Sequence, residues 1–186
     1  MTPTDIAVLF ANAIESIGGS YFIGGSVAST LYSEPRTTND IDIVVRLHPR
    51  HAAALAERLG PAFEADVRMV EQALRDGVTS NIFYLPALTK LDLFTCGNSP
   101  YDEIEFERRQ AIDVGNGRTL FVKSPEDSVL RKLWWFRQGG ETSERQWRDV
   151  ISLLRINANT LDAKHLQLWA NVLSIADLLE RAQASL

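Results

Sequence analysis

Two aspartates alternate with isoleucines in the stretch Asp40-Ile41-Asp42-Ile43, which otherwise has the composition of a buried β-strand. Side chains alternate between the faces of a strand, so Asp40 and Asp42 share one face, about 7 Å apart at their roots. Like charges at this spacing repel each other unless a cation lies between them. Carboxylate oxygens suit Mg²⁺ or Mn²⁺, so the pair predicts a metal site. The alternative is an edge strand whose polar face is solvated.

A second feature that could take part in chemistry is the turn Gly24-Gly25-Ser26. It lies between a predicted strand at 21–23 and a predicted short helix at 26–32. Backbone N–H groups at such a turn, together with a helix N-terminus, can hold a phosphate, and glycines let the ligand approach the backbone closely. The alternative is a tight turn in which Ser26 is an ordinary helix N-cap.

A third carboxylate, Asp92, interrupts another strand-like stretch, residues 87–94, where Leu91 and Leu93 face the opposite side. If this strand pairs with the strand expected at 40–47, three carboxylates meet on one face of a sheet. Three acids beside a phosphate-binding turn are typical of two-metal phosphoryl transfer, in which the metals hold the attacking and leaving oxygens.

The elements that position these residues follow from the hydrophobic periodicity and from turn signals. A first helix is expected from an N-cap at Thr4 to Gly18, and the chain after Ser124 is expected to be helical throughout. The pattern predicts an α+β fold, with a mixed β-sheet core at 1–123 flanked by helices and a helical C-terminal region at 124–186 packed on it. Further helices are expected at 49–60 and 66–77, and strands at 80–86, 87–94, 110–114 and 119–123.

Composition limits the classes of protein to consider. The chain has 186 residues, a formal net charge of -5 and a single cysteine, which excludes an intramolecular disulfide and a cysteine-based zinc site. No stretch is apolar for long enough to cross a membrane, and the acidic start does not have the pattern of a signal peptide. We therefore expect a cytoplasmic protein with no membrane partner.

The arrangement of the two aspartates, the glycine turn and Asp92 resembles the nucleotidyltransferase superfamily related to DNA polymerase β. Thirteen residues separate Ser26 from Asp40. The stretches "RTTNDID", "SPEDSVLRKLWW" and "RQWRDVISLL" look most like its small bacterial branch. That branch includes minimal nucleotidyltransferases and toxin subunits of abortive-infection type toxin–antitoxin systems. The likeness covers most of residues 20–155 and implies a nucleotidyltransferase core.

The resemblance also implies a role for each motif residue. Asp40 and Asp42 would bind both magnesium (or manganese) ions, while Asp92 would bind one of them and help to deprotonate the acceptor hydroxyl. Gly24, with Gly25 and Ser26, would hold the terminal phosphates of a nucleoside triphosphate.

Four further polar residues are candidates for supporting roles. Arg36 and Lys132 are placed to contact phosphates, although Arg36 could be a solvated turn residue and Lys132 could lie along an apolar helix face. Thr38 either orients a carboxylate or caps the turn. Asp149 is expected to orient Lys132.

The function implied is transfer of a nucleoside monophosphate from a triphosphate such as ATP to a hydroxyl, with release of pyrophosphate. A local excess of two positive charges after residue 122 favours a polyanionic acceptor such as RNA, with a protein hydroxyl as the other macromolecular choice. The protein would then be a toxin with an antitoxin partner. The residues counted are Lys123, Arg131, Lys132, Arg137, Arg145 and Arg148 against Glu126, Asp127, Glu141 and Glu144.

Three alternatives stay open at the level of sequence. One is an inactive nucleotidyltransferase-fold binding module, although such a module has no chemical reason to keep three mutually repelling acids on one face. Another is a nucleotidyltransferase for a small molecule such as an antibiotic. The third, an Asp-X-Asp glycosyltransferase, gives no role to the glycine turn.

Overall fold

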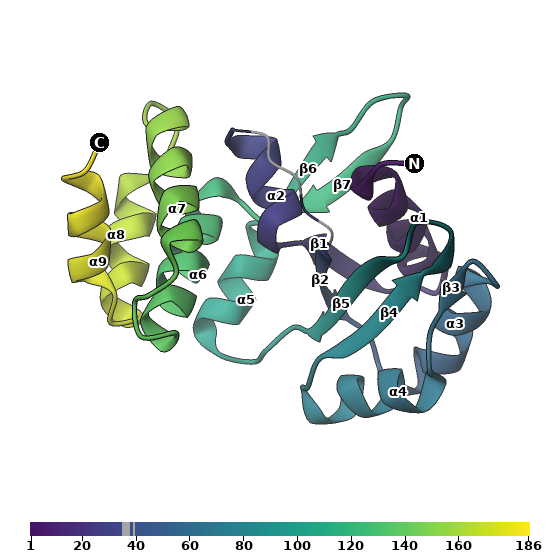
Figure 1. Cartoon of the computed structure of the whole chain (residues 1–186). Helices are drawn as coiled ribbons and strands as arrows, with labels where there is room; N and C mark the ends of the chain where they lie inside the picture. Colours follow the sequence, from purple (N-terminus) through teal and green to yellow (C-terminus); the bar gives the residue numbers. More distant parts are fainter. Residues whose placement is uncertain (35–37, 39) are drawn as a thin grey trace. The chain divides into compact units, whose positions relative to one another are not determined.

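The computed structural model spans the whole chain and is described for residues 1–34, 38 and 40–186. The chain forms two compact units, one made of residues 1–27 and 37–123 and the other of residues 28–36 and 124–186. The first unit holds the sheet, and the second is helical (Figure 1). The predicted α+β fold with a mixed sheet and a helical C-terminal third is therefore confirmed. No helix in the described part of the chain could cross a membrane.

Within the described residues, seven strands form one sheet in the order β3-β4-β5-β2-β1-β7-β6. Strands β2 and β5 pair in parallel, as do β1 and β7, and the other neighbours pair antiparallel. Two antiparallel hairpins, β4–β5 and β6–β7, join strands that were expected from the sequence. The bounds are β1 Ser20–Ile23, β2 Asp40–Arg46, β3 Phe63–Glu64, β4 Ser80–Tyr84, β5 Thr89–Thr95, β6 Gln110–Asp113 and β7 Thr119–Val122.

One face of this sheet is the hydrophobic core of the first unit. Ile41, Ile43 and Val45 of β2 are fully buried there, together with Leu91 and Leu93 of β5. Three helices lie on this side of the sheet: α1 contacts β1 and β7, α4 contacts β4 and β5, and α3 packs against α1 and α4 (Figure 1). They are α1 Pro3–Ser16, α3 Ala52–Leu59 and α4 Val67–Asp76. Because side chains alternate along β2, burying the isoleucines forces both aspartates onto the opposite face.

The first helix begins two residues earlier than the sequence suggested. Thr2, not Thr4, is the N-cap of α1: its Oγ1 accepts a hydrogen bond from Asp5 N, and the Asp5 carboxylate accepts one from Thr2 N. Pro3 fills the first helical position, where no N–H is needed. The reciprocal capping box outweighs the cap chemistry of Thr4.

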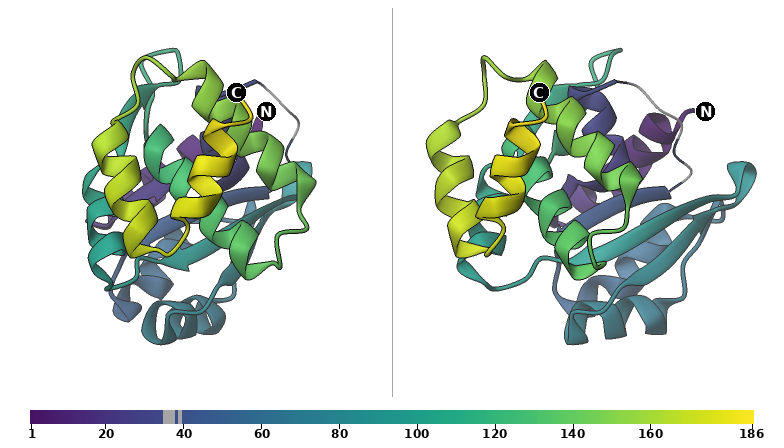
Figure 2. Two further views of the ribbon diagram at one scale, coloured as in Figure 1. Left: turned by 90° about the vertical axis from the view of Figure 1, so that its left-hand side faces the viewer. Right: turned by 60° about the vertical axis from the view of Figure 1, so that its left-hand side comes forward.

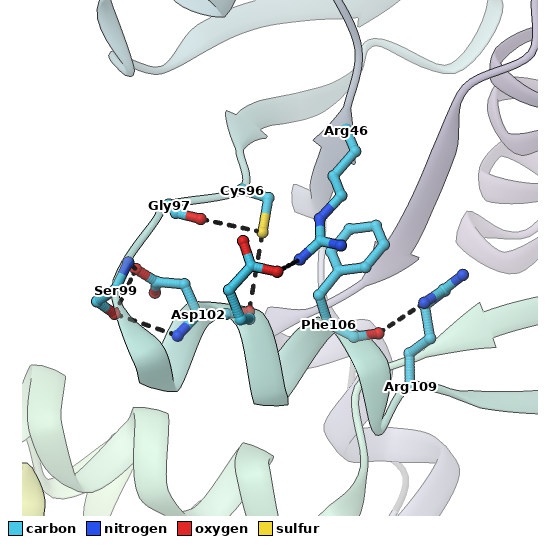
Figure 3. A network of polar contacts seen from close by, with 8 residues as sticks. Arg46, Cys96, Gly97, Ser99, Asp102, Phe106 and Arg109 are labelled. Carbon is cyan, nitrogen blue, oxygen red and sulfur yellow. Dashed lines mark hydrogen bonds and ion pairs between the residues drawn. The ribbon is translucent and has the colours of Figure 1, made fainter.

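Helix α5, Pro100–Glu107, covers the far end of the carboxylate-bearing face. The Phe106 ring packs on Phe22 of β1 with centroids 5.5 Å apart, and the Arg46 guanidinium lies 4.1 Å from the Phe106 centroid. Arg46 also pairs with Glu103 at 2.6 Å, and the Cys96 thiol contacts the carbonyl oxygens of Gly97 and Asp102 (Figure 3). Burial raises the pKa of this lone thiol, which fits a structural role.

The acidic stretch of α5 is only partly the solvated helix face that its composition suggests. Glu105 is buried, and its carboxylate lies 2.9 Å from the Nζ of Lys123, which is also buried. The Lys123 side chain in turn lies beside the backbone of Gly24. The pair therefore ties α5 to the strand end next to the glycine turn.

The second unit is built around the N-terminus of α6. As expected, Ser124 caps the helix: its Oγ accepts from Asp127 N at 3.1 Å and donates to the Asp127 carboxylate at 2.7 Å. Asp127 is fully buried and hydrogen-bonded to His165 Nε2 at 2.8 Å, which links α6 to α8. The four C-terminal helices pack side by side in both views of Figure 2. They are α6 Pro125–Gln138, α7 Glu144–Ile156, α8 Ala163–Val172 and α9 Ala176–Gln183; the remaining helix, α2 Gly25–Tyr32, begins in the first unit.

The buried pair of Glu105 and Lys123 generates a prediction about stability. Glu105→Ala leaves the Lys123 ammonium buried without its carboxylate, so the free energy of unfolding should fall by about 3–5 kcal/mol. Glu107→Ala removes an exposed acid from the same helix and should change it by less than about 0.5 kcal/mol. Urea denaturation of both variants measures the difference. Equal, small effects would show that the pair does not hold α5 in place.

Candidate active site

The three predicted carboxylates lie on adjacent strands of the first unit and on one face of its sheet. Strands β2 and β5 run parallel in a register that places Asp42 directly beside Asp92, and Asp40 beside Lys90. Neighbouring strands are about 4.8 Å apart, so the side chains of Asp42 and Asp92 start about this distance from each other. The pairing of these two strands, on which the sequence-based site depended, is therefore present.

The glycine turn touches the carboxylates directly. Gly24 N donates a hydrogen bond to the backbone oxygen of Asp42 at 2.8 Å, which fixes the turn to β2. Gly25 follows with φ +53°, and a Cβ added there would lie 1.7 Å from Asp42 Oδ2. Only glycine allows both this backbone conformation and this approach. The turn and the carboxylates are thus parts of one site, with Ser26 next along the chain.

Lys90, which was not singled out in the sequence, lies among the carboxylates. Its Nζ is 2.9 Å from Asp92 Oδ2 and 3.7 Å from Asp40 Oδ1. The hydrogen bond to Asp92 raises the pKa of Lys90 above its usual range, and the charges of Asp92, Asp40 and Asp42 act in the same direction against desolvation. The spacing in the sequence could have indicated this, because a lysine two residues before Asp92 on the same strand lies on the same face of the sheet as Asp92.

The donor set fits a hard divalent cation in its chemistry, because it consists of carboxylate oxygens beside a turn that needs glycine. The exposure of the acids also fits a cation site that solvent can reach: 57% of the Asp40 side chain is accessible, while 14% of the Asp92 side chain is. Even so, no group of His, Cys, Asp or Glu side chains in the described ranges is already arranged to hold a metal. Among the residues that the structure describes, Lys90 brings a positive charge to these acids.

The supporting residues differ in where they lie. Thr38 Oγ1 donates to the backbone oxygen of Asp40 at 3.2 Å, so it caps the entry to β2, one of its two expected roles. Lys132 and Asp149 belong to the second unit, where Nζ and Oδ2 are 2.8 Å apart, the contact expected of an orienting carboxylate. Arg36 lies outside the described residues.

The count of positive charges after residue 122 does not describe a free cationic surface. Lys123 is buried against Glu105, and Lys132 is paired with Asp149. Arg137 donates to both carboxylate oxygens of Asp177 at 2.7 and 2.8 Å. At least these three cations are already neutralised, so the excess that favoured a polyanionic acceptor loses its physical basis.

No protein-family model and no curated protein matches the chain. Among the solved structures that resemble it, three match over nearly its whole length. The solution structure of the antibiotic-resistance factor ANT(2'')-Ia is 15% identical with a TM-score of 0.53, covering all of both chains. The structure of ANT(2'')-Ia in complex with adenylyl-2''-tobramycin is 13% identical with a TM-score of 0.53, covering 92% of this chain and 97% of that one.

The third is an antigenic nucleotidyltransferase-like protein from Paracoccidioides brasiliensis, 19% identical with a TM-score of 0.55, covering 98% of this chain and 93% of that one. At such low identity these likenesses concern the fold. They agree with the sheet described above and with the motif resemblance in its sequence. The chain therefore has the nucleotidyltransferase fold.

Proposed function

We propose that this protein is a metal-dependent nucleotidyltransferase that moves a nucleoside monophosphate from a nucleoside triphosphate to a hydroxyl acceptor and releases pyrophosphate. The observation that carries the proposal is the register of β2 and β5, which sets Asp42 beside Asp92 next to the Gly24-Gly25 turn. This fold with this set of residues gives no support to the glycosyltransferase alternative. An inactive binding module is left as an outcome of the test.

Each residue of the site has a role in this reaction. Asp40 and Asp42 would hold Mg²⁺ or Mn²⁺, which supplies charge neutralisation for the triphosphate and for the attacking oxygen. Asp92, whose side chain is only 14% exposed, would take the proton of the acceptor hydroxyl. The amides of the glycine turn and the Ser26 hydroxyl would hold the terminal phosphates. Most of the rate enhancement would come from positioning and electrostatics.

The order of the strands suggests the side from which the acceptor enters. In-line displacement needs the attacking oxygen and the leaving pyrophosphate on opposite sides of the α-phosphorus. With the phosphates at the turn after β1, the acceptor would lie over β5 and β4, because the sheet order is β1-β2-β5-β4. There Asn81 lies opposite Asp92, and Phe83 lies opposite Lys90 with 39% of its surface exposed.

The exposed ring of Phe83 favours the end of an RNA as the acceptor, because a nucleobase can stack on an aromatic ring beside the site. A protein hydroxyl is the other macromolecular choice. In either case the proposal includes a cytoplasmic toxin held in check by an antitoxin.

A small-molecule acceptor is the second candidate. It is favoured by the whole-chain likeness to ANT(2'')-Ia, a protein solved with an adenylylated tobramycin. It is also compatible with the pairing of Lys123, Lys132 and Arg137, which removes the charge argument against a cationic antibiotic.

The proposed activity predicts metal-dependent labelling. Purified protein, each α-labelled triphosphate and Mg²⁺ are incubated with cell extract, and the labelled fraction is identified. Asp42→Asn should lower transfer at least about 100-fold, because it removes a metal ligand. Label in RNA or protein would support a macromolecular acceptor, and label in small molecules alone would support the second candidate. Absence of transfer with every triphosphate would favour the inactive module.

The contact between the glycine turn and Asp42 predicts a specific effect of a single methyl group. Gly25→Ala forces the Asp42 carboxylate to move, so Mn²⁺ binding measured by titration calorimetry should weaken at least about tenfold. Gly77→Ala is the matched control: Gly77 has a similar φ of +69° in the left-handed helical region but nothing within 4 Å of an added Cβ. Both variants should lose about 1 kcal/mol of stability from the strained backbone. Equal metal affinity in the two would contradict the site.

The proposed direction of acceptor entry predicts a role for Phe83. Phe83→Ala should raise KM for the acceptor about 5- to 100-fold, the range expected for loss of one stacking contact, and leave the KM for the triphosphate unchanged. Met69→Ala, an exposed apolar residue on α4 over the opposite face of the sheet, is the control. An unchanged acceptor KM, or a change confined to the triphosphate, would place the acceptor elsewhere.

A further inference from the structure

Lys90 is the cation that the described structure places at the three carboxylates. It precedes Asp92 by two residues on β5, and its register partners are Asp40 on one side and Phe83 on the other. The ammonium lies nearer to Asp92, at 2.9 Å, than to Asp40, at 3.7 Å. The third acid, Asp42, is the register partner of Asp92 on β2 and shares its face of the sheet. One lysine thus faces all three acids of the site.

At this position a positive charge can reduce the repulsion among the carboxylates. Parallel pairing holds Asp42 and Asp92 on adjacent strands, and the buried face of β2 prevents either aspartate of that strand from turning away. Such fixed, like charges raise each other's free energy unless a positive charge is near. The ammonium of Lys90 supplies that charge within hydrogen-bonding distance of Asp92.

The ammonium group of Lys90 is also able to move away from Asp92. Its side chain is 36% exposed, so it is not enclosed by the core. A lysine carries its charge on a flexible four-carbon stem, and rotation of that stem moves the ammonium away without shifting β5. Asp92 would then be released to bind a metal or accept a proton.

We propose that Lys90 is a built-in counter-ion that holds the carboxylates together in the metal-free protein and swings off Asp92 when a divalent cation binds. The inference rests on the proposed function only in taking that cation to be the metal of nucleotidyl transfer. Lys90 is therefore a positioning residue. It stabilises the metal-free state at the expense of metal affinity, because binding must first break the contact with Asp92.

The first test is metal binding without any substrate. Lys90→Met should bind Mn²⁺ about tenfold more tightly in titration calorimetry than the unaltered protein, because no ammonium competes for the carboxylates. In EDTA the same variant should melt at least about 3 °C lower, and saturating Mn²⁺ should remove that difference. Lys90→Arg keeps the charge and should retain the melting temperature in EDTA. Lys164→Met, at an exposed lysine on α8, should change neither quantity.

The second test follows the ammonium itself. The chain has four lysines, Lys90, Lys123, Lys132 and Lys164, so acylation of each can be read by peptide mass spectrometry. A salt-bridged amine reacts slowly, and release from Asp92 should raise the acylation rate of Lys90 several-fold on adding Mg²⁺. Lys164 should react at the same rate with and without metal.

The outcomes separate this inference from the proposed function. If Mg²⁺ and Mn²⁺ bind, but Lys90→Met binds them no more tightly and the reactivity of Lys90 does not rise, Lys90 is not a displaceable counter-ion. Metal-dependent transfer would survive that result. If the unaltered protein binds neither metal, the proposed metal site itself is wrong.

Discussion

Three carboxylates are held on one face of a sheet, and their mutual repulsion is the constraint that the surrounding elements must offset. The hydrophobic core fixes them there: burying Ile41 and Ile43 under α1, α3 and α4 leaves Asp40 and Asp42 no other direction. Parallel pairing with β5 then adds Asp92 on the neighbouring strand, directly beside Asp42. A sequence that only needed to fold would place neutral residues at these positions.

The neighbouring elements fit this concentration of charge. Gly25 brings the turn after β1 against the Asp42 carboxylate, a contact that any side chain would block. The pair of Lys123 and Glu105 buries its own charges beside that turn while docking α5. Lys90 supplies the counter-charge. In this arrangement a divalent cation would replace an interaction that the protein already makes with its own lysine, so metal binding becomes an exchange of cations.

The sequence predicted the parts of the site that depend on alternation along single strands. The facing of Asp40, Asp42 and Asp92 and the pairing of β2 with β5 could be anticipated, because period-two patterns and the family resemblance both indicated them. Ion pairs between side chains of elements that are distant in the sequence could not be anticipated. Charge counting took Lys123 as a surface cation, yet it is buried in an ion pair with Glu105. Lys90 shared the signal of Asp92, a polar residue at every second position, and was overlooked.

The most direct test of this account is a crystal structure with Mn²⁺ and a non-hydrolysable nucleoside triphosphate, in which anomalous scattering locates the metal. The account predicts an anomalous peak within about 2.5 Å of the oxygens of Asp42, shared with Asp40 or Asp92. It also predicts terminal phosphates on the amides of the Gly24-Gly25 turn and a Lys90 ammonium that no longer contacts Asp92. A metal bound elsewhere, or a triphosphate bound away from that turn with Lys90 still on Asp92, would contradict it.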